Sequence, residues 1–113
     1  MHELSITQSI LSITLEKAEG ARAKRVTRVN LTFGEISGIV DDCVRFYFNF
    51  LSKDTIAAQA ELAFNHRPIE LCCQNCQTTF SPGKTDWSCP KCHQGKAELV
   101  AGRECYVESI EVE

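Results

Sequence analysis

The chain has 113 residues, enough for one modest hydrophobic core and a small accessory module. Hydrophobic residues make up 43% and charged residues 24%, as in ordinary globular proteins. The formal net charge is −3, from 12 Lys and Arg against 15 Asp and Glu, so no general attraction to nucleic acid or anionic membrane is expected. No apolar run could span a bilayer, and the first residues lack the pattern of a secretory signal. We therefore expect a cytoplasmic protein.

Residues 4–20 predict an amphipathic helix that lies on a sheet. Ser5 and Gln8 resemble a capping box at its start, and Gly20 is a natural stop. The helix therefore begins only a few residues after His2, which anchors the start of the chain. Its apolar residues form two adjacent rows at helical spacing, Leu4, Leu11, Leu15 and Ala18 in one and Ile6, Ile10 and Ile13 in the other.

Residues 24–34 alternate like a half-buried strand, with Thr27, Val29, Leu31 and Phe33 on one face. After a turn-rich connector, residues 39–55 predict a second helix, whose first turn is favoured by two aspartates. We expect its apolar residues to share one buried face, which consists of Val40, Cys43, Val44, Tyr47 and Leu51 and is broadened by Phe46 and Phe50.

Two later segments, 60–68 and 105–113, also predict strands. Between them the composition shifts, because residues 71–102 hold five of the seven cysteines and two of the three prolines. The apolar content there is too thin for a separate core. We predict an α+β fold in which two helices pack on a small mixed β-sheet of about three strands. Residues 1–68 and 103–113 would form one domain, and residues 69–102 an inserted zinc-binding domain.

Two Cys-x-x-Cys pairs dominate this inserted segment. Cys73 and Cys76 form the first pair, and Cys89 and Cys92 follow after a twelve-residue loop. Each tight turn points two sulfurs at one ion, so the pairs together supply the four thiolates of a tetrahedral zinc site. Four thiolates close the coordination sphere, which predicts a structural zinc ribbon and not a zinc hydrolase. The metal would supply folding free energy that the apolar side chains cannot.

Two alternatives to a structural zinc ribbon of this kind stay open. Disulfides or a redox Cys-x-x-Cys pair are disfavoured by a reducing compartment and by the odd number of cysteines. A zinc-ribbon adaptor that binds protein or nucleic acid would need no second metal. The module has no basic patch, so nucleic acid is the weaker of these two partners.

The remaining cysteines and histidines have simpler interpretations. Cys72 fits the ligand spacing less well than its neighbour and is left out of the site. Cys43 and Cys105 are expected to be buried, small hydrophobic side chains. His93 either lies in a solvated loop, the simpler interpretation, or substitutes as a zinc ligand. His66 is assigned no role.

The first three residues form a second candidate metal site. A large residue at position 2 normally prevents removal of the initiator methionine, so Met1 should keep a free α-amine. That amine, the His2 backbone nitrogen and the His2 imidazole can chelate one ion, and a further backbone nitrogen or the Glu3 carboxylate can complete a square. Planar nitrogen coordination favours Ni(II) or Cu(II) over zinc. By its chemistry alone, a histidine at position 2 is weak evidence.

Several motifs together resemble one family over essentially the whole chain. They are "MHELSITQSI" at the start, "RVTRVNLTFGEISGI" in the first third, "CQNC", "CPKC" and the closing "SIEVE". This combination is similar to the HypA/HybF family of nickel metallochaperones, which act in the maturation of nickel–iron hydrogenases. The resemblance implies a protein that delivers Ni(II) and is not an enzyme.

The same resemblance implies the roles of individual residues and the partners. Nickel would bind at Met1 and His2 with Glu3 nearby, and the four paired cysteines would hold zinc. The partners would be the GTPase of the same maturation pathway and the large subunit of a nickel–iron hydrogenase, without nucleic acid or membrane. Some relatives also serve urease. A monomer and a homodimer, including one swapped through the last strand, both stay open.

Overall fold

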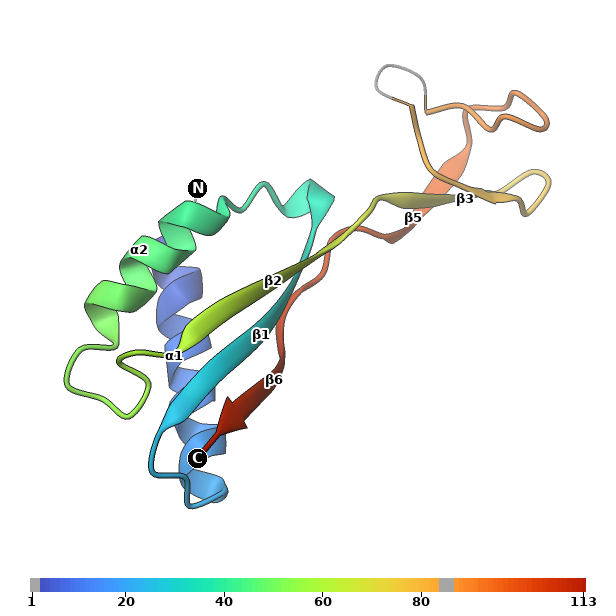
Figure 1. The fold of residues 1–113 in the computed structure, drawn as a ribbon. Coiled ribbons are helices and arrows are strands. Elements are labelled where there is room, and N and C mark those ends of the chain that lie inside the picture. Colours follow the sequence, from blue (N-terminus) through green and yellow to red (C-terminus); the bar gives the residue numbers. More distant parts are fainter. Residues whose placement is uncertain (1–2, 84–86) are drawn as a thin grey trace.

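A computed structural model describes residues 3–83 and 87–113 (Figure 1). The fold is elongated, with extents of 55 × 26 × 17 Å. The elements in chain order are α1 Glu3–Gly20, β1 Val26–Gly34, a 3₁₀ turn η1 Glu35–Ser37, α2 Asp41–Leu51, β2 Glu61–Arg67, β3 Glu70–Cys73, β4 Thr79–Phe80, β5 Ala97–Ala101 and β6 Cys105–Val112. Within the described ranges, no helix combines the length and apolar character needed to cross a membrane.

The larger sheet has the strand order β2-β1-β6. Strand β1 runs parallel to β2, with Leu31 opposite Phe64, and antiparallel to β6, with Leu31 opposite Val107. A parallel pair needs a crossover connection, and α2 provides it between β1 and β2. The predicted fold class, two helices on a small mixed sheet of three strands, is confirmed.

Helices α1 and α2 lie side by side on one face of this sheet (Figure 1). Alternate residues of β1 point into the core, and Val29, Leu31 and Phe33 are completely or almost completely buried. Ile10 of α1 and Phe48 of α2 pack into the same cluster. Apolar burial therefore holds this part of the molecule together.

The buried stripe of α1 differs from the predicted rows. Two threonines lie on it, and the Thr14 hydroxyl donates to the Ile10 carbonyl at 2.7 Å, so its polar atom is satisfied within the helix. Leu4 and Ile13, predicted as core, are exposed. The helix begins at Glu3, so Ser5 lies inside it and is not its cap. The stripe comprises Glu3, Thr7, Ile10, Thr14 and Ala18.

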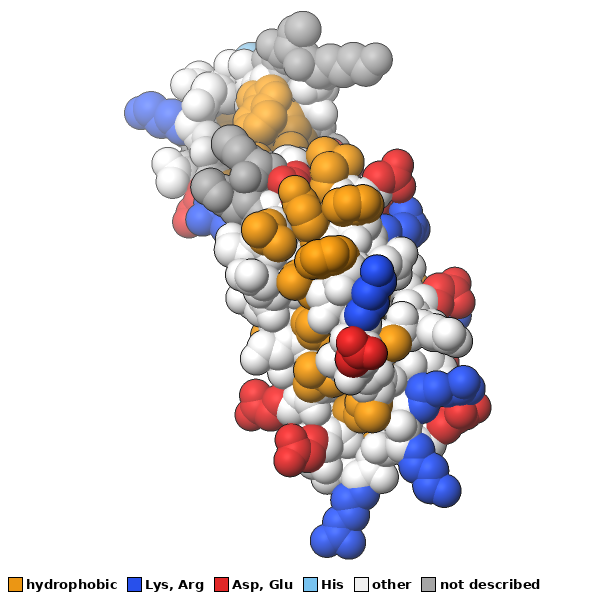
Figure 2. Space-filling model, turned by 90° about the vertical axis from the view of Figure 1, so that its left-hand side faces the viewer, with side chains coloured by type: hydrophobic (Ala, Val, Ile, Leu, Met, Phe, Trp, Pro, Cys, Tyr) orange, Lys and Arg blue, Asp and Glu red, His pale blue; other side chains and the backbone are white. Residues whose placement is uncertain are grey.

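The buried face of α2 is narrower than predicted. Val44 and Phe48 are fully buried, whereas Phe46 and Phe50 are 68% and 65% exposed. Each residue of a helix is turned by about 100° from the previous one, so Phe46 and Phe50 point away from the side of α2 that carries Phe48. A single sheet therefore cannot cover the rings of Phe46, Phe48 and Phe50 together. Cys43 is also exposed, which contradicts its predicted burial. Hydrophobic side chains consequently gather on the outer surface (Figure 2).

A smaller antiparallel sheet, with the order β4-β3-β5, lies at the far end of the molecule. At the junction, a Cβ added to Gly34 would lie 2.0 Å from the Gly102 carbonyl oxygen. Gly102 itself has a φ of +115°, a conformation that favours glycine, and its oxygen accepts the Ile36 N–H at 2.9 Å. Two glycines therefore let the backbones cross where the sheets meet. The domain boundaries at 69 and 102 stay a prediction.

Candidate metal centre

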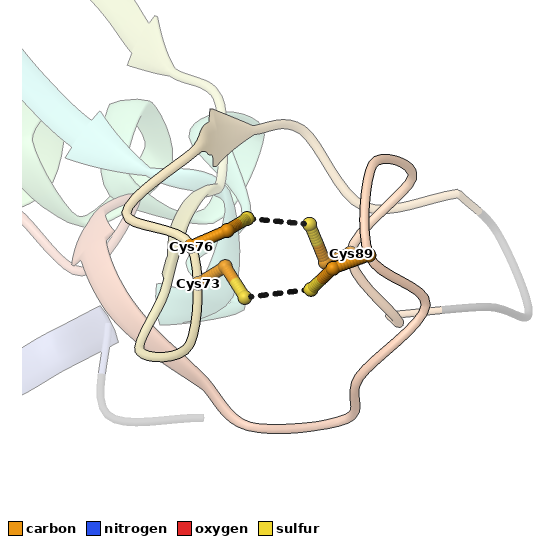
Figure 3. Close-up of side chains that lie close together, drawn as sticks. Cys73, Cys76 and Cys89 are labelled. Carbon is orange, nitrogen blue, oxygen red and sulfur yellow. Dashed lines mark hydrogen bonds between the residues drawn. The ribbon is translucent and has the colours of Figure 1, made fainter.

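The four paired cysteines come together beside the smaller sheet (Figure 3). Their sulfurs all lie within 4.8 Å of one another. The Sγ atoms of Cys73 and Cys92 are 3.4 Å apart, and those of Cys76 and Cys89 are 3.5 Å apart. Sulfurs bound to one zinc at about 2.3 Å are separated by about 3.8 Å, while a disulfide needs about 2.05 Å. The cluster therefore has the dimensions of a four-thiolate metal site.

Both Cys-x-x-Cys turns have the same backbone structure. The Gln77 N–H donates to the Cys73 carbonyl at 2.8 Å, and the His93 N–H donates to the Cys89 carbonyl at 2.8 Å. The N–H of each first cysteine also donates to the carbonyl five residues later, at 2.9 and 3.0 Å. Gln77 and His93 close the turns with φ of 64° and 62°, in the left-handed region. Repetition of this turn aims each pair of sulfurs at one point.

The electrostatics differ among the four thiols. The Thr78 hydroxyl lies 3.1 Å from the Cys76 sulfur and, with other hydrogen bonds, lowers the pKa of Cys76 to about 6. The Cys76 backbone N–H lowers the pKa of Cys73, but burial and the sulfurs of Cys92 and Cys76 outweigh it and raise that pKa to about 11. Cys76 is thus the more easily ionised of the two thiols, and Cys73 must lose its proton to solvent when a metal binds.

Other candidate ligands lie outside this cluster. Cys72 precedes Cys73 on β3 and so points to the opposite side of the strand. His93 is exposed at its turn position and does not join the four sulfurs, in agreement with the simpler interpretation of a solvated loop. Cys105 is exposed at the start of β6, contrary to the predicted burial.

At the other candidate site, Met1 and His2 lie outside the described residues. Glu3 is the first residue of α1 and is only 8% exposed. Its Oε2 atom accepts the Val40 N–H at 3.2 Å, immediately before α2. The carboxylate therefore joins the start of one helix to the start of the other.

A pair that sequence reasoning missed lies next to this contact. The His66 Nε2 atom is 2.7 Å from the Asp41 Oδ2 atom. In a β–α–β crossover, the helix begins near the carboxyl ends of both parallel strands, so the topology brings Asp41 at the start of α2 close to His66 near the end of β2. This rule was the signal that could have suggested the pair.

Comparisons with known proteins agree with this geometry. The family model described as "Hydrogenase/urease nickel incorporation, metallochaperone, hypA" matches residues 1–112. A "Hydrogenase maturation factor HypA" of Dehalococcoides mccartyi strain 195 is 46% identical over 113 residues, which cover 100% of this chain and 95% of that protein.

Two solved structures have the same fold. "Solution structure of HypA protein" superposes with a TM-score of 0.78 at 27% identity, covering 100% of this chain and 97% of that one. "Solution structure of the Ni metallochaperone HypA from Helicobacter pylori" gives 0.68 at 26% identity, covering 99% and 97%. With these likenesses over its whole length, the chain belongs to the HypA family of hydrogenase and urease nickel-incorporation metallochaperones, a family of maturation factors and not of enzymes.

Proposed function

We propose that this protein binds Ni(II) at its amino terminus and delivers it to the large subunit of a nickel–iron hydrogenase. The observation that carries the proposal is the family match over residues 1–112, which includes the Met-His-Glu start of the chain. The ligands would be the Met1 α-amine, the His2 backbone nitrogen and the His2 imidazole. Either a further backbone nitrogen or the Glu3 carboxylate would be the fourth ligand. Planar coordination by these nitrogens suits Ni(II).

The chemistry of a chain end suits delivery. A carrier must bind nickel selectively and still release it to the next protein. A few ligands on a terminus can leave the ion one at a time, or be reprotonated near neutral pH, since the amine and the imidazole have ordinary pKa values of about 7.7–8.0 and 6.5. An enclosed cage would hold the ion too firmly for transfer.

The cysteine cluster would hold a structural zinc ion through Cys73, Cys76, Cys89 and Cys92. The donor set supports this assignment, because four soft thiolates at tetrahedral spacing suit zinc and leave no position for a substrate. We propose that the metal gives residues 69–102 a fixed shape, either to position the terminus or to present a face to a partner protein. Intact nickel affinity and partner binding after zinc removal would contradict that role.

The partners would be the GTPase of the same pathway and the hydrogenase large subunit, in the cytoplasm. The family description includes urease as well as hydrogenase. We favour hydrogenase as the client, because the relative at 46% identity is described as a hydrogenase maturation factor. Pull-down with the purified GTPase, with and without nickel, tests the first of these contacts.

The test of nickel binding is a calorimetric titration of tag-free protein with its native amine. His2→Ala and a form extended by a few residues before Met1 serve as matched variants. We expect one nickel site in the native protein and none in either variant, with zinc retained in all three. Equal binding by all three forms would contradict a site at the terminus and move nickel elsewhere, with His66, His93 and the spare cysteines as the first candidates. No nickel binding by the native protein would favour the zinc-ribbon adaptor instead.

A further inference from the structure

The His66–Asp41 pair lies on the surface between α2 and β2. The distance between His66 Nε2 and Asp41 Oδ2 is 2.7 Å, and the side chains are 48% and 27% exposed. The other carboxylate oxygen, Asp41 Oδ1, is buried and has no hydrogen-bond partner in residues 3–83 and 87–113. The imidazole therefore satisfies one of the two oxygens of this carboxylate, Oδ2.

The His66 ring is itself held in place by a row of aromatic side chains. It stacks on Phe64, with ring centroids 6.5 Å apart and planes 12° from parallel. Phe64 in turn contacts Phe33 at 5.7 Å, and the Arg45 guanidinium lies 4.6 Å above the Phe64 ring. Because Phe33 is buried in the core, the imidazole is supported from the centre of the sheet.

Asp41 connects His66 to the start of α1 through the backbone of the preceding residue. It directly follows Val40, whose N–H donates to the Glu3 carboxylate at 3.2 Å. Val40 is the residue before the first turn of α2, and its own side chain makes no capping hydrogen bond there. A chain of contacts thus runs from His66 on β2 through Asp41 and the Val40 backbone to Glu3.

We propose that His66 is a positioning residue for the amino-terminal nickel site. It fixes Asp41, and with it the Val40 N–H that orients the Glu3 carboxylate. This inference rests on the proposed function, since it assumes that nickel binds at the terminus. His66 itself touches no nickel. Its loss lowers nickel affinity by releasing the start of α2, an outer-shell effect of about 10-fold.

Two substitutions separate the hydrogen bond from the stacking. His66→Phe keeps a ring against Phe64 and removes the hydrogen bond to Asp41. His66→Gln keeps a donor near the position of Nε2 and removes the stacking. Tyr106→Phe is the matched control, because it removes a polar atom from an exposed ring on β6, a strand that takes no part in this chain of contacts.

Each zinc-loaded protein is measured in two ways. Nickel affinity is determined by calorimetry, and hydrogen exchange of the Val40 amide is followed by NMR without nickel. Circular dichroism and the thermal midpoint show whether each variant is folded. We expect His66→Phe to weaken nickel binding about 10-fold and to speed Val40 exchange, while His66→Gln and Tyr106→Phe stay close to the native protein.

Three outcomes overturn the proposal. If His66→Phe changes neither reading, the contact chain does not operate. If it speeds Val40 exchange but leaves nickel affinity unchanged, His66 has only a structural role. If His2→Ala binds nickel as the native protein does, the proposed function itself fails. The His2→Ala titration shows that failure independently of the His66 variants.

Discussion

The two ends of the molecule are stabilised by different means. The sheet under α1 and α2 has a continuous apolar core in which Val29, Leu31, Val44 and Phe48 are fully buried. At the other end, among the described residues, the fully buried side chains are those of two cysteines, Cys73 on β3 and Cys89 in the second Cys-x-x-Cys turn. The apolar side chains buried beside them are few, Leu71 at 3% and Ala101 at 5% exposure. We therefore contrast a region that folds by burying hydrocarbon with a region whose fold, under the proposed zinc assignment, would depend on a metal.

The largest effect should come from breaking the metal-dependent region. Cys89→Ser removes one of the four thiolates, so we expect loss of zinc and unfolding of residues 69–102, because metal binding and folding are coupled there. The helices and the larger sheet should stay folded. Zinc analysis with two-dimensional NMR would show this, and Cys43→Ser, at an exposed free cysteine, is the control. Loss of the folded-state NMR signals of the helices and the larger sheet as well would contradict the independent stabilisation of the two regions.

The apolar region should be most sensitive at Phe48. Phe48→Ala removes a fully buried ring and should lower the free energy of unfolding by about 3–5 kcal/mol. Phe46→Ala, two residues away and 68% exposed, should change it by less than about 0.5 kcal/mol. Urea denaturation followed by far-UV circular dichroism measures both. A similar decrease in the free energy of unfolding in both variants would contradict a core that contacts the Phe48 side of α2 and not the Phe46 side.

The junction between the regions should tolerate no side chain at Gly34. The added methyl group of Gly34→Ala would overlap the Gly102 carbonyl, so we expect a loss of about 1–3 kcal/mol from displaced backbone. Gly20→Ala has open space around its Cβ and should be neutral or slightly stabilising. Thermal unfolding compares the two, and an unchanged midpoint in Gly34→Ala would contradict the close crossing.

The smallest effect concerns acid sensitivity of the junction. The pKa of Glu104 is lowered by its own N–H, by the Gly102 N–H at 2.8 Å and by Arg67. A folded-state pKa below the ordinary value means that the ionised carboxylate stabilises the fold above pH 4.5, and that this contribution is lost as the pH falls. The stability difference between native protein and Glu104→Gln should therefore be constant from pH 5 to 7 and shrink in more acid solution. A constant difference down to pH 3 would contradict this.

The two regions also differ in how much of their structure could be predicted from the sequence. The cysteine pairs could be predicted from spacing, because the two-residue gap itself defines the turn that aims the sulfurs. The helices were found, but their buried faces were partly wrong. Thr7 and Thr14 count as polar in a hydropathy pattern, yet their hydroxyls bond to carbonyls within α1 and leave the methyl groups for the core.

The remaining errors had a tertiary cause. The rows of α2 contained more large apolar residues than one face can bury, and only the position of the sheet selects Phe48 over Phe46 and Phe50. The His66–Asp41 contact joins residues 25 positions apart in sequence and depends on the parallel pairing of β1 and β2. A local pattern contains no information on either point.

The most direct test of the account is X-ray absorption at the nickel and zinc edges of protein loaded with one equivalent of each metal. We predict four sulfur atoms at about 2.3 Å around zinc and only nitrogen and oxygen around nickel. Sulfur in the nickel shell, or fewer than four sulfurs around zinc, would contradict a delivery site at the amino terminus that is separate from a closed cysteine centre.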